Sequence, residues 1–461
     1  MQMIPQSVYN NPSFVPECKG YFGCPALSSI YFGFGNNAFK LKNIVQKSND
    51  DSVVFSPENI LNHLAKNNHI DLDFRMDILS LGFKVKNNYV TFSLAEKFYM
   101  IFNFPQDLLN YFIKGNYNEA FLGKTANLSN ISLNALYYHE LAIGFNRQVN
   151  KNLNIGIRPK FLVGVADIQT KKSDLSIYTA PEEDLHDITL NSEININTHL
   201  PEVIFNDSAG TSGGGGEGSE FNHMMSMFGP YITDLSNFGF GIDLGGNYKI
   251  SSKLDVSLAL LDLGYIKWNS STSQNFSYKT NNARFTFQGL DLIDLFSSGS
   301  SDSTKPKPLD KLNDTLSKIF EVSETHQSYT TMLPLKCVAD VSFALTKNDK
   351  IGVIFMEENW QKRFYTSVGI SYTRKFWKFI QLSLNYSYRN RDFDAGFGLA
   401  LNLGPLQVYA ITDNVLAYIF YNEIKVDENK TSIIYPRNAN LLTIHAGLNL
   451  VFGKGPVKYK F

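Results

Sequence analysis

The stretch Ile380–Arg389, IQLSLNYSYR, decides the predicted fold, because apolar and polar residues alternate along it. Its apolar side carries Ile380, Leu382, Leu384, Tyr386 and Tyr388, and its polar side carries Gln381, Ser383, Asn385, Ser387 and Arg389. A strand points successive side chains to opposite faces, so the stretch predicts a two-sided strand. Many such strands, long enough to cross a bilayer and tipped with aromatic residues, predict a closed barrel with lipid outside and polar side chains inside.

The composition agrees with a membrane barrel better than with a soluble enzyme. Of 461 residues, 18% are charged and 14% are aromatic, with 36 Phe and 24 Tyr, which is aromatic-rich and charge-poor. The net charge of -1 argues against a nucleic-acid partner, which would require a basic face. No run of about 18 apolar residues occurs, so we expect no transmembrane helix. A barrel escapes that test because polar residues alternate with apolar ones along each strand.

The same alternation recurs along the chain. The expected strands are 27–34, 70–85, 89–104, 136–146, 153–165, 238–250, 254–268, 335–345, 351–357, 364–373, 380–389, 395–403, 406–411 and 441–452. We therefore predict an all-β fold, a transmembrane antiparallel β-barrel of about 14 strands, or 16 if a weaker pair at 175–179 and 188–200 joins it. Both counts are even, which places both termini in the periplasm and every long insert outside the cell.

The predicted domain organisation is one barrel with a separate N-terminal segment. Residues 1–26 are rich in Pro, Gly and Asn, and their prolines disfavour a long helix or a central strand, so we expect a periplasmic or lumenal plug there. The barrel would span 27–452 and end in a periplasmic tail, 453–461. Extracellular inserts are expected at 36–68, 105–128, 167–234, 269–332 and 413–440, with short helices at 56–67, 105–114 and near 310–320. Residues 1–29 show no export signal, so we treat the chain as mature or truncated.

Three cysteines, Cys18, Cys24 and Cys337, provide no disulfide framework. Cys18 and Cys24 are close enough in sequence to pair in an oxidising periplasm, and the alternative is two free thiols within the plug. The sequence leaves that choice open.

No pattern predicts catalysis. Residues 210–214, GTSGG, fit the G-x-S-x-G pattern, but they open a glycine-rich loop instead of joining a strand to a helix. The eight histidines show no zinc-ligand spacing. We expect no enzyme, no catalytic residue, no cofactor and no metal.

The polar faces of the strands give the candidate site residues. Those predicted to line the lumen are Arg158, Lys160, Asp243, Asn247, Gln381, Asn385, Arg389 and His445. Two interpretations remain: paired charges fill the lumen, or Arg158 and Lys160 attract an anionic or fatty-acid head group.

Two stretches carry a resemblance to a known family. They are the N-terminal run with Ile4-Pro5-Gln6-Ser7, Asn11-Pro12, Pro16-Glu17-Cys18-Lys19 and Leu27-Ser28-Ser29, and the later run 260–268, LLDLGYIKW. They resemble a Bacteroidota family of outer-membrane barrels of unassigned function, which in turn looks like FadL-type barrels, including the PorV component of the type IX secretion system. The resemblance implies 14 strands and an N-terminal hatch within the lumen, with Pro5, Asn11, Pro12, Pro16 and Cys18 as plug residues.

Three short motifs resemble the O-glycan acceptor motif of Bacteroidota, with Ser52, Ser208 and Thr315 as acceptors. All three lie in predicted outer loops. The partners expected for such a chain are outer-membrane lipid and lipopolysaccharide, other outer-membrane or surface proteins, and a hydrophobic solute.

Two functional classes follow. The first is a non-enzymatic, PorV-like subunit of an outer-membrane assembly or secretion machine, favoured by the large outer inserts, since such loops often carry binding. The alternative is a FadL-like channel for a hydrophobic or amphipathic small molecule. A channel requires a path lined by apolar residues, whereas a subunit predicts a sealed lumen.

Overall fold

A computed structural model describes most of the chain as one β-barrel. The residues described are 3–39, 45–47, 53–55, 57–115, 118–181, 187–200, 236–286, 321–361, 363–377, 379–389, 392–414, 421–425, 432–436 and 440–454. Among them, no helix is long and apolar enough to cross a membrane.

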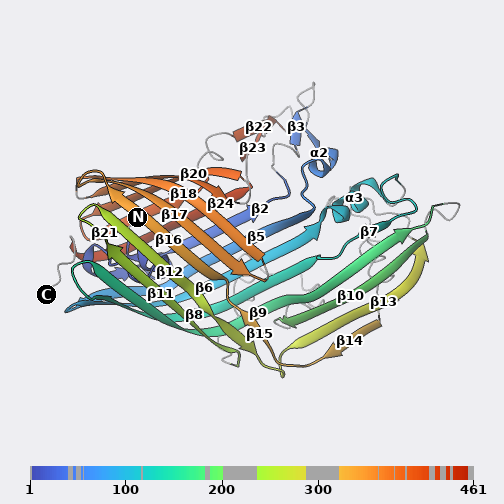
Figure 1. Ribbon diagram of the computed structural model, residues 1–461, viewed down its shortest axis with the longest axis horizontal. Helices are drawn as coiled ribbons and strands as arrows, with labels where there is room; N and C mark the ends of the chain where they lie inside the picture. Colours follow the sequence, from blue (N-terminus) through green and yellow to red (C-terminus); the bar gives the residue numbers. More distant parts are fainter. Residues whose placement is uncertain are drawn as a thin grey trace, which may run out of the picture.

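Fourteen antiparallel strand positions close the barrel, as the alternation predicted (Figure 1). In wall order they are β1 (Cys18–Gly23) with β2 (Ile30–Asn36), β5 (Asn67–Val85), β6 (Asn88–Pro105), β8 (Ser132–Gln148), β9 (Leu153–Thr179), β11 (Phe238–Lys249), β12 (Leu254–Trp268), β15 (Tyr329–Met332) with β16 (Leu335–Ala344), β17 (Asp349–Trp360), β18 (Arg363–Phe376), β19 (Ile380–Arg389), β20 (Asp392–Leu403), β21 (Leu406–Thr412) and β24 (Leu441–Lys454). The first position pairs with both β5 and β24, so the sheet has no free edge in the wall.

The first wall strand begins earlier than the sequence predicted and is interrupted. We expected a strand at 27–34 after a plug ending at 26, but β1 already lies in the wall. The prolines do not prevent this, because Pro16 precedes β1 and Pro25 lies in the break at 24–29. Across the break, the Cys24 amide donates to the Leu448 carbonyl and the Ala26 amide to the Ile78 carbonyl, so the wall stays hydrogen-bonded.

Two predicted inserts are in part continuations of the wall strands. β9 runs for 27 residues and pairs beyond the barrel with β7 (Thr125–Asn127) and β10 (Asp187–His199). β10 pairs in turn with β13 (Gln274–Thr286), which pairs with β14 (Glu321–Thr325). The expected strand at 175–179 is therefore the end of β9, and the extra pair extends the sheet without entering the barrel.

Small elements complete the described chain. They are the 3-10 helix η1 (Pro5–Tyr9), helices α2 (Pro57–Leu61) and α3 (Gln106–Lys114), and the hairpins β3 (Val45–Lys47) with β4 (Val53–Phe55) and β22 (Tyr421–Lys425) with β23 (Ser432–Pro436). α3 matches its predicted range, whereas α2 is shorter than the helix expected at 56–67. The helix expected near 310–320, the G-x-S-x-G residues 210–214 and the acceptors Ser52, Ser208 and Thr315 lie outside the described residues.

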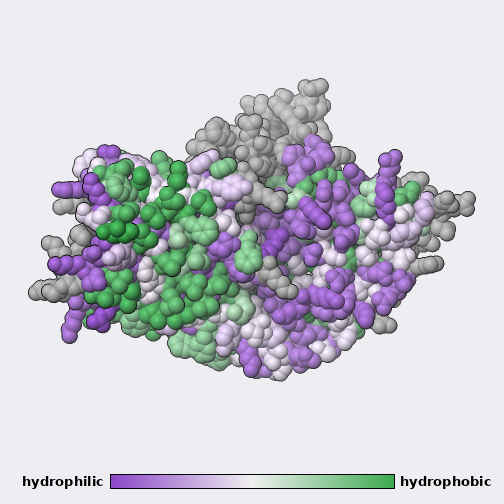
Figure 2. All heavy atoms as spheres, in the orientation of Figure 1, coloured by the Kyte–Doolittle hydropathy of each residue, from purple (hydrophilic) through white to green (hydrophobic). Residues whose placement is uncertain are grey.

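An apolar belt surrounds the half of the barrel that carries the tight turns, which we call the turn end. Figure 2 shows hydrophobic residues gathered over this half and hydrophilic ones over the other, which we call the loop end. Exposed outward side chains of the belt include Phe83, Phe145, Phe161, Phe240, Leu258, Val341, Ile370, Tyr386, Phe393 and Phe452. Such a band on a closed barrel is the surface that lipid covers.

Candidate functional site

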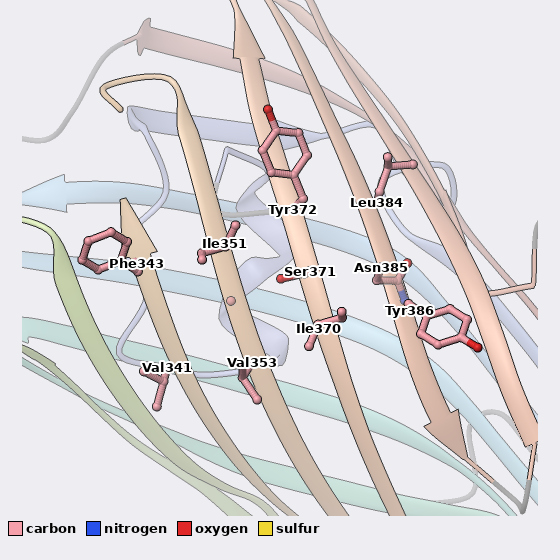
Figure 3. A pocket seen from close by; sticks show the side chains of 11 residues that line it. Val341, Phe343, Ile351, Val353, Ile370, Ser371, Tyr372, Leu384, Asn385 and Tyr386 are labelled. Atoms are coloured by element: carbon pink, nitrogen blue, oxygen red, sulfur yellow. The ribbon is translucent and has the colours of Figure 1, made fainter. Parts of the chain in front are cut away.

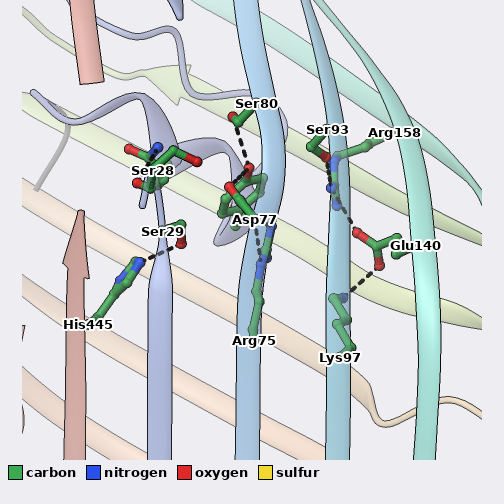
Figure 4. A network of polar contacts seen from close by, with 12 residues as sticks. Ser28, Ser29, Arg75, Asp77, Ser80, Ser93, Lys97, Glu140, Arg158 and His445 are labelled. Atoms are coloured by element: carbon green, nitrogen blue, oxygen red, sulfur yellow. Dashed lines mark hydrogen bonds and ion pairs between the residues drawn. The ribbon is translucent and has the colours of Figure 1, made fainter. Parts of the chain in front are cut away.

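The lumen beside β5, β6, β8 and β9 holds a cluster of buried charges (Figure 4). Arg158 is 2% exposed, and its guanidinium donates to Glu140 at 2.8 Å, to Asp243 at 3.1 Å and to Ser93 at 2.7 Å. These partners come from β6, β8 and β11, so Arg158 ties three strands to its own strand, β9. The alternation of side chains along β9 directs the Arg158 guanidinium into the lumen, because the neighbouring Ile157 faces lipid.

Two lysines extend the cluster toward β12. Lys160 lies 2.6 Å from Asp262 and 2.5 Å from Asp243, and Lys97 lies 2.6 Å from Glu140 and 3.2 Å from Asp262. All five side chains are nearly or fully buried. The backbone helps to place one carboxylate, since the Asp262 amide donates to Asp243 across a β-bulge.

The cluster is electrically balanced. Its cations are Arg75, Lys97, Arg158 and Lys160, and its anions are Asp77, Glu140, Asp243 and Asp262. Buried charges are tolerated when they are paired and hydrogen-bonded. The charge of Arg158 and Lys160 is therefore already matched, which favours the interpretation that these side chains fill the lumen over the one in which they hold a head group.

Four contacts join strands that are not neighbours in the wall. Lys97 of β6 meets Asp262 of β12, and Lys336 of β16 lies 3.8 Å from Asp73 of β5. Aromatic rings repeat the pattern: Tyr99 contacts Trp360 with ring centroids 6.0 Å apart, and His69 contacts Tyr365 at 5.4 Å. These contacts divide the lumen into two sides.

The two sides differ in the size and exposure of their inward side chains. On the β6–β9 side the inward residues are buried, and many of them are large: Lys97, Tyr99, Tyr138, Glu140, Arg158 and Lys160. On β17, β18 and β19 the inward faces include a set of small residues, which we call the small-residue wall: Gly352, Ser367, Gly369, Ser371, Ser383 and Ser387. All of these except Gly369 are partly exposed. Ile354, which lies beside Gly369, keeps 39% exposure. Accessible surface on inward residues requires open space beside them.

The remaining predicted lumen residues are scattered around the wall. Gln381 and Asn247 are buried, and Asn385 donates to Asp413 at 3.4 Å. Arg389 is partly buried beyond Asn385 on the same face of β19. His445 lies on β24, 2.9 Å from the Ser29 hydroxyl and 3.1 Å from the Tyr409 hydroxyl. The structure thus brings Arg158, Lys160 and Asp243 together and leaves the other five apart from them.

Residues 3–16, which we call the lumenal segment, cross the barrel at the turn end. Met3 and Ile4 pack against Ala400 and Tyr409 of β20 and β21. The Gln6 amide donates to Asn449 of β24 at 2.9 Å and to the Ser28 carbonyl at 3.0 Å. The segment therefore starts on the side of β20, β21 and β24.

The middle of the segment contacts the charge cluster. The Tyr9 hydroxyl donates to Asp77 at 2.5 Å, and the Arg75 guanidinium lies 3.4 Å from the centre of the Tyr9 ring. Arg158 approaches the same ring at 5.0 Å. Cation–π contacts of this kind strengthen when they are desolvated.

The end of the segment reaches β8, β9 and β11. Asn146 donates to the Pro12 carbonyl at 3.0 Å. Gly156 and Gly245 face this stretch, and a Cβ on either would overlap Pro12 or Asn11. Both glycines are required by close approach of two backbones, so the segment lies directly against the wall.

Among the predicted plug residues, Pro5, Asn11, Pro12 and Pro16 are buried in or beside this segment, whereas Cys18 belongs to β1. Glu17 forms an ion pair with Lys375 of β18. The Cys18 thiol lies 3.4 Å from the Tyr89 hydroxyl, and all three cysteines are free.

One polar pair was missed by sequence reasoning. Glu96 interrupts the apolar face of β6, and the structure places it 2.8 Å from His139 of β8. Because strand register decides which residue of β8 lies opposite Glu96, the sequence held no signal for this pair.

Comparisons with known proteins give one family and several solved barrels. The model of a family described as a family of unknown function, DUF5723, matches residues 12–413. No curated protein matches the chain.

Three solved structures illustrate the likeness. The Ralstonia pickettii toluene transporter TbuX aligns at 7% identity over 97% of this chain and 94% of its own, with a TM-score of 0.44. A Pseudomonas aeruginosa FadL homologue aligns at 9% identity over 97% and 94%, with a TM-score of 0.41. The Pseudomonas putida toluene transporter TodX aligns at 9% identity over 98% and 94%, with a TM-score of 0.38.

Proposed function

We propose that this chain, which belongs to DUF5723, a family of unknown function, is an outer-membrane channel for a hydrophobic or amphipathic small molecule. The proposal rests on the asymmetry of its lumen. The turn end and both termini face the periplasm, and the extended strands β9, β10 and β13 face outward. The lumenal segment closes the periplasmic mouth.

The small-residue wall carries this proposal. A lumen filled only for stability would be packed all round, as it is beside Lys97, Glu140 and Arg158. Instead, the small-residue wall of β17–β19 is partly exposed, and Ile354 offers an apolar surface to that space. Lys336 and Glu358 lie beyond Ile354 toward the loop end, with a long 3.6 Å contact between them. The path therefore combines an apolar contact with a charged pair, which suits an amphipathic solute.

The lumenal segment is the gate in this proposal. It touches walls on both sides of the lumen, through Ile4 and Tyr409 at one end and Pro12 and Asn146 at the other. A PorV-like subunit, which the large outer inserts favour in the sequence, requires no such divided lumen.

Displacing the segment tests the proposal. Gly156→Val would force Pro12 away from β9, and deletion of residues 3–13 would remove the closure altogether. In liposomes, we expect both variants to take up a fluorescently labelled fatty acid faster than the native protein and to conduct in planar bilayers. Phe161→Val, on the lipid face of the same strand, is the matched control and should behave as the native protein. Unchanged uptake and conductance in both variants would overturn the channel.

A further inference from the structure

The outward face of the barrel carries two apolar grooves within the belt. The first, of about 490 Å³, lies over β16–β19 between Phe343, Ile351, Tyr372 and Leu384 (Figure 3). The second, of about 930 Å³, runs across β8, β9, β11 and β12. Both volumes fall in the range of pockets that bind small ligands, about 300–1,000 Å³. Their position in the belt means that lipid covers both.

Strand register explains the second groove, which we call the Gly246 groove. Arg147, Ile155, Gly246 and Leu258 lie opposite one another in a single row across four strands. Gly246 points outward, and a Cβ there would meet nothing within 4 Å. The missing side chain leaves a depression between Ile155 and Leu258, which are 47% and 59% exposed. Leu244, the preceding residue of β11 that points outward, also lines this groove.

The residue at one end of this row, Arg147, is a cation. Arg147 is exposed on the outward face, close to the turn at the end of β8. No acidic partner is found for it in the described part of the chain. A charged side chain on the lipid face near the interface reaches toward the head groups.

The turns beside the Gly246 groove add to the positive charge. Lys151, Lys249 and Lys253 lie in or next to the turns after β8 and β11, residues 149–152 and 250–253, which contain no acidic residue. The Lys249 amide donates to the Asn152 carbonyl, so the two turns are adjacent. Asp255, which lies opposite Lys249 in the pairing of β11 with β12, already pairs with Lys350 at 3.3 Å. The region therefore attracts anions.

The first groove differs in this respect. Its nearest cation, Arg374, lies 3.2 Å from Asp349, and the Tyr372 hydroxyl donates to the same carboxylate at 2.6 Å. The charge at its end is neutralised within the protein.

We propose that the Gly246 groove is a binding site for one anionic phospholipid. One acyl chain lies over Gly246 between Ile155 and Leu258, and the head-group phosphate lies on Arg147. The first groove binds lipids without preference for the charge of their head groups. The site is on the outer wall, so it is independent of the channel proposed above.

Native mass spectrometry of the protein released from bilayers of phosphatidylethanolamine and phosphatidylglycerol tests the site. We expect one phosphatidylglycerol to remain bound to the native protein. Arg147→Gln should lower its retention about five-fold, the effect of one basic residue near an anionic surface. Gly246→Leu should lower it as well, because the side chain fills the depression without changing the charge. Arg374→Gln, an equal charge change at the first groove, should retain the lipid.

Heat-modifiable migration in gels establishes that each variant is folded. Full retention by either Arg147→Gln or Gly246→Leu would overturn the site, and so would equal retention of phosphatidylethanolamine by the native protein. Loss of retention in all three variants would show general charge attraction instead of a site and would also overturn it.

Discussion

The Lys97 ammonium of β6 lies 3.2 Å from the Asp262 carboxylate of β12, although β8, β9 and β11 separate the two strands in the wall. Lys97→Met would leave Glu140 and Asp262 with one cation fewer in a dry environment. Breaking a buried pair in this way costs about 3–5 kcal/mol. We expect a clearly lower unfolding temperature, which heat-modifiable migration on gels in detergent would measure.

The matched control for that variant is Lys172→Gln. Lys172 pairs with Glu193 at 2.6 Å, but both side chains are over 40% exposed. Solvent screens such an exposed pair, so stability should barely change. Equal losses in both variants would contradict a special role for the buried pair of Lys97 and Asp262.

Tyr9→Phe tests how the lumenal segment is held. The change removes the hydrogen bond to Asp77 and keeps the ring under Arg75. Hydrogen bonds to charged groups contribute about 1.5–3 kcal/mol, so the segment should open more often. Amide hydrogen exchange over residues 3–16 should accelerate. Tyr372→Phe, which also loses a bond to an aspartate but in a distant turn, should leave that exchange unchanged.

The ion pair between Glu17 and Lys375 joins the chain before β1 to β18 across the mouth of the barrel. Glu17→Lys and Lys375→Glu should each accelerate exchange in residues 3–16, because each places like charges together. The double variant restores opposite charges and should return the exchange toward the native rate. Additive effects of the two substitutions would show that the pair does not act as a unit.

Acid should weaken the turn between β16 and β17. Hydrogen bonds from Thr346 and Tyr372, and then the charge of Arg374, hold the pKa of Asp349 below its usual value. Its ionised form is therefore favoured by folding, so the contribution is present above about pH 4, the unfolded value, and is lost as the pH falls through the folded value. Asp349→Asn should lower the unfolding temperature at pH 7, and the difference from the native protein should vanish in acid. A difference that persists at low pH would contradict this assignment.

The barrel was predictable because its signal is repeated and local. Alternation along β19, with Leu384 outward and Asn385 inward, gives the two faces of the wall without any tertiary information. The tight turns then give the strand count. The break between β1 and β2 was not predictable, since proline marks only where a strand is disfavoured and Ala26 adopts a positive φ of 58° there.

The site was predictable only in part, because partners depend on register. Alternation places Arg158 and Lys160 inward, but nothing local says that Glu140, from β8, contacts both of them or that Asp262, from β12, contacts Lys160. Lys97 and Glu140 were missed for the same reason. The lumenal segment depends on Gly156 and Gly245, whose role appears only when Pro12 is placed against them.

Narrowing the small-residue wall tests the solute path most directly. Ser387→Trp would fill the partly exposed space beside Gly369, where Ser387 already approaches the position of a Cβ. In a Gly156→Val background, whose lumenal segment is displaced, we expect uptake of the labelled fatty acid to fall to background. Tyr388→Trp, at the adjacent lipid-facing position, should leave uptake unchanged, because the indole points away from the lumen. Overpacking can cost about 1–3 kcal/mol, so heat-modifiable migration must show that both barrels are folded. Undiminished uptake through a folded Ser387→Trp barrel would place the path elsewhere in the lumen.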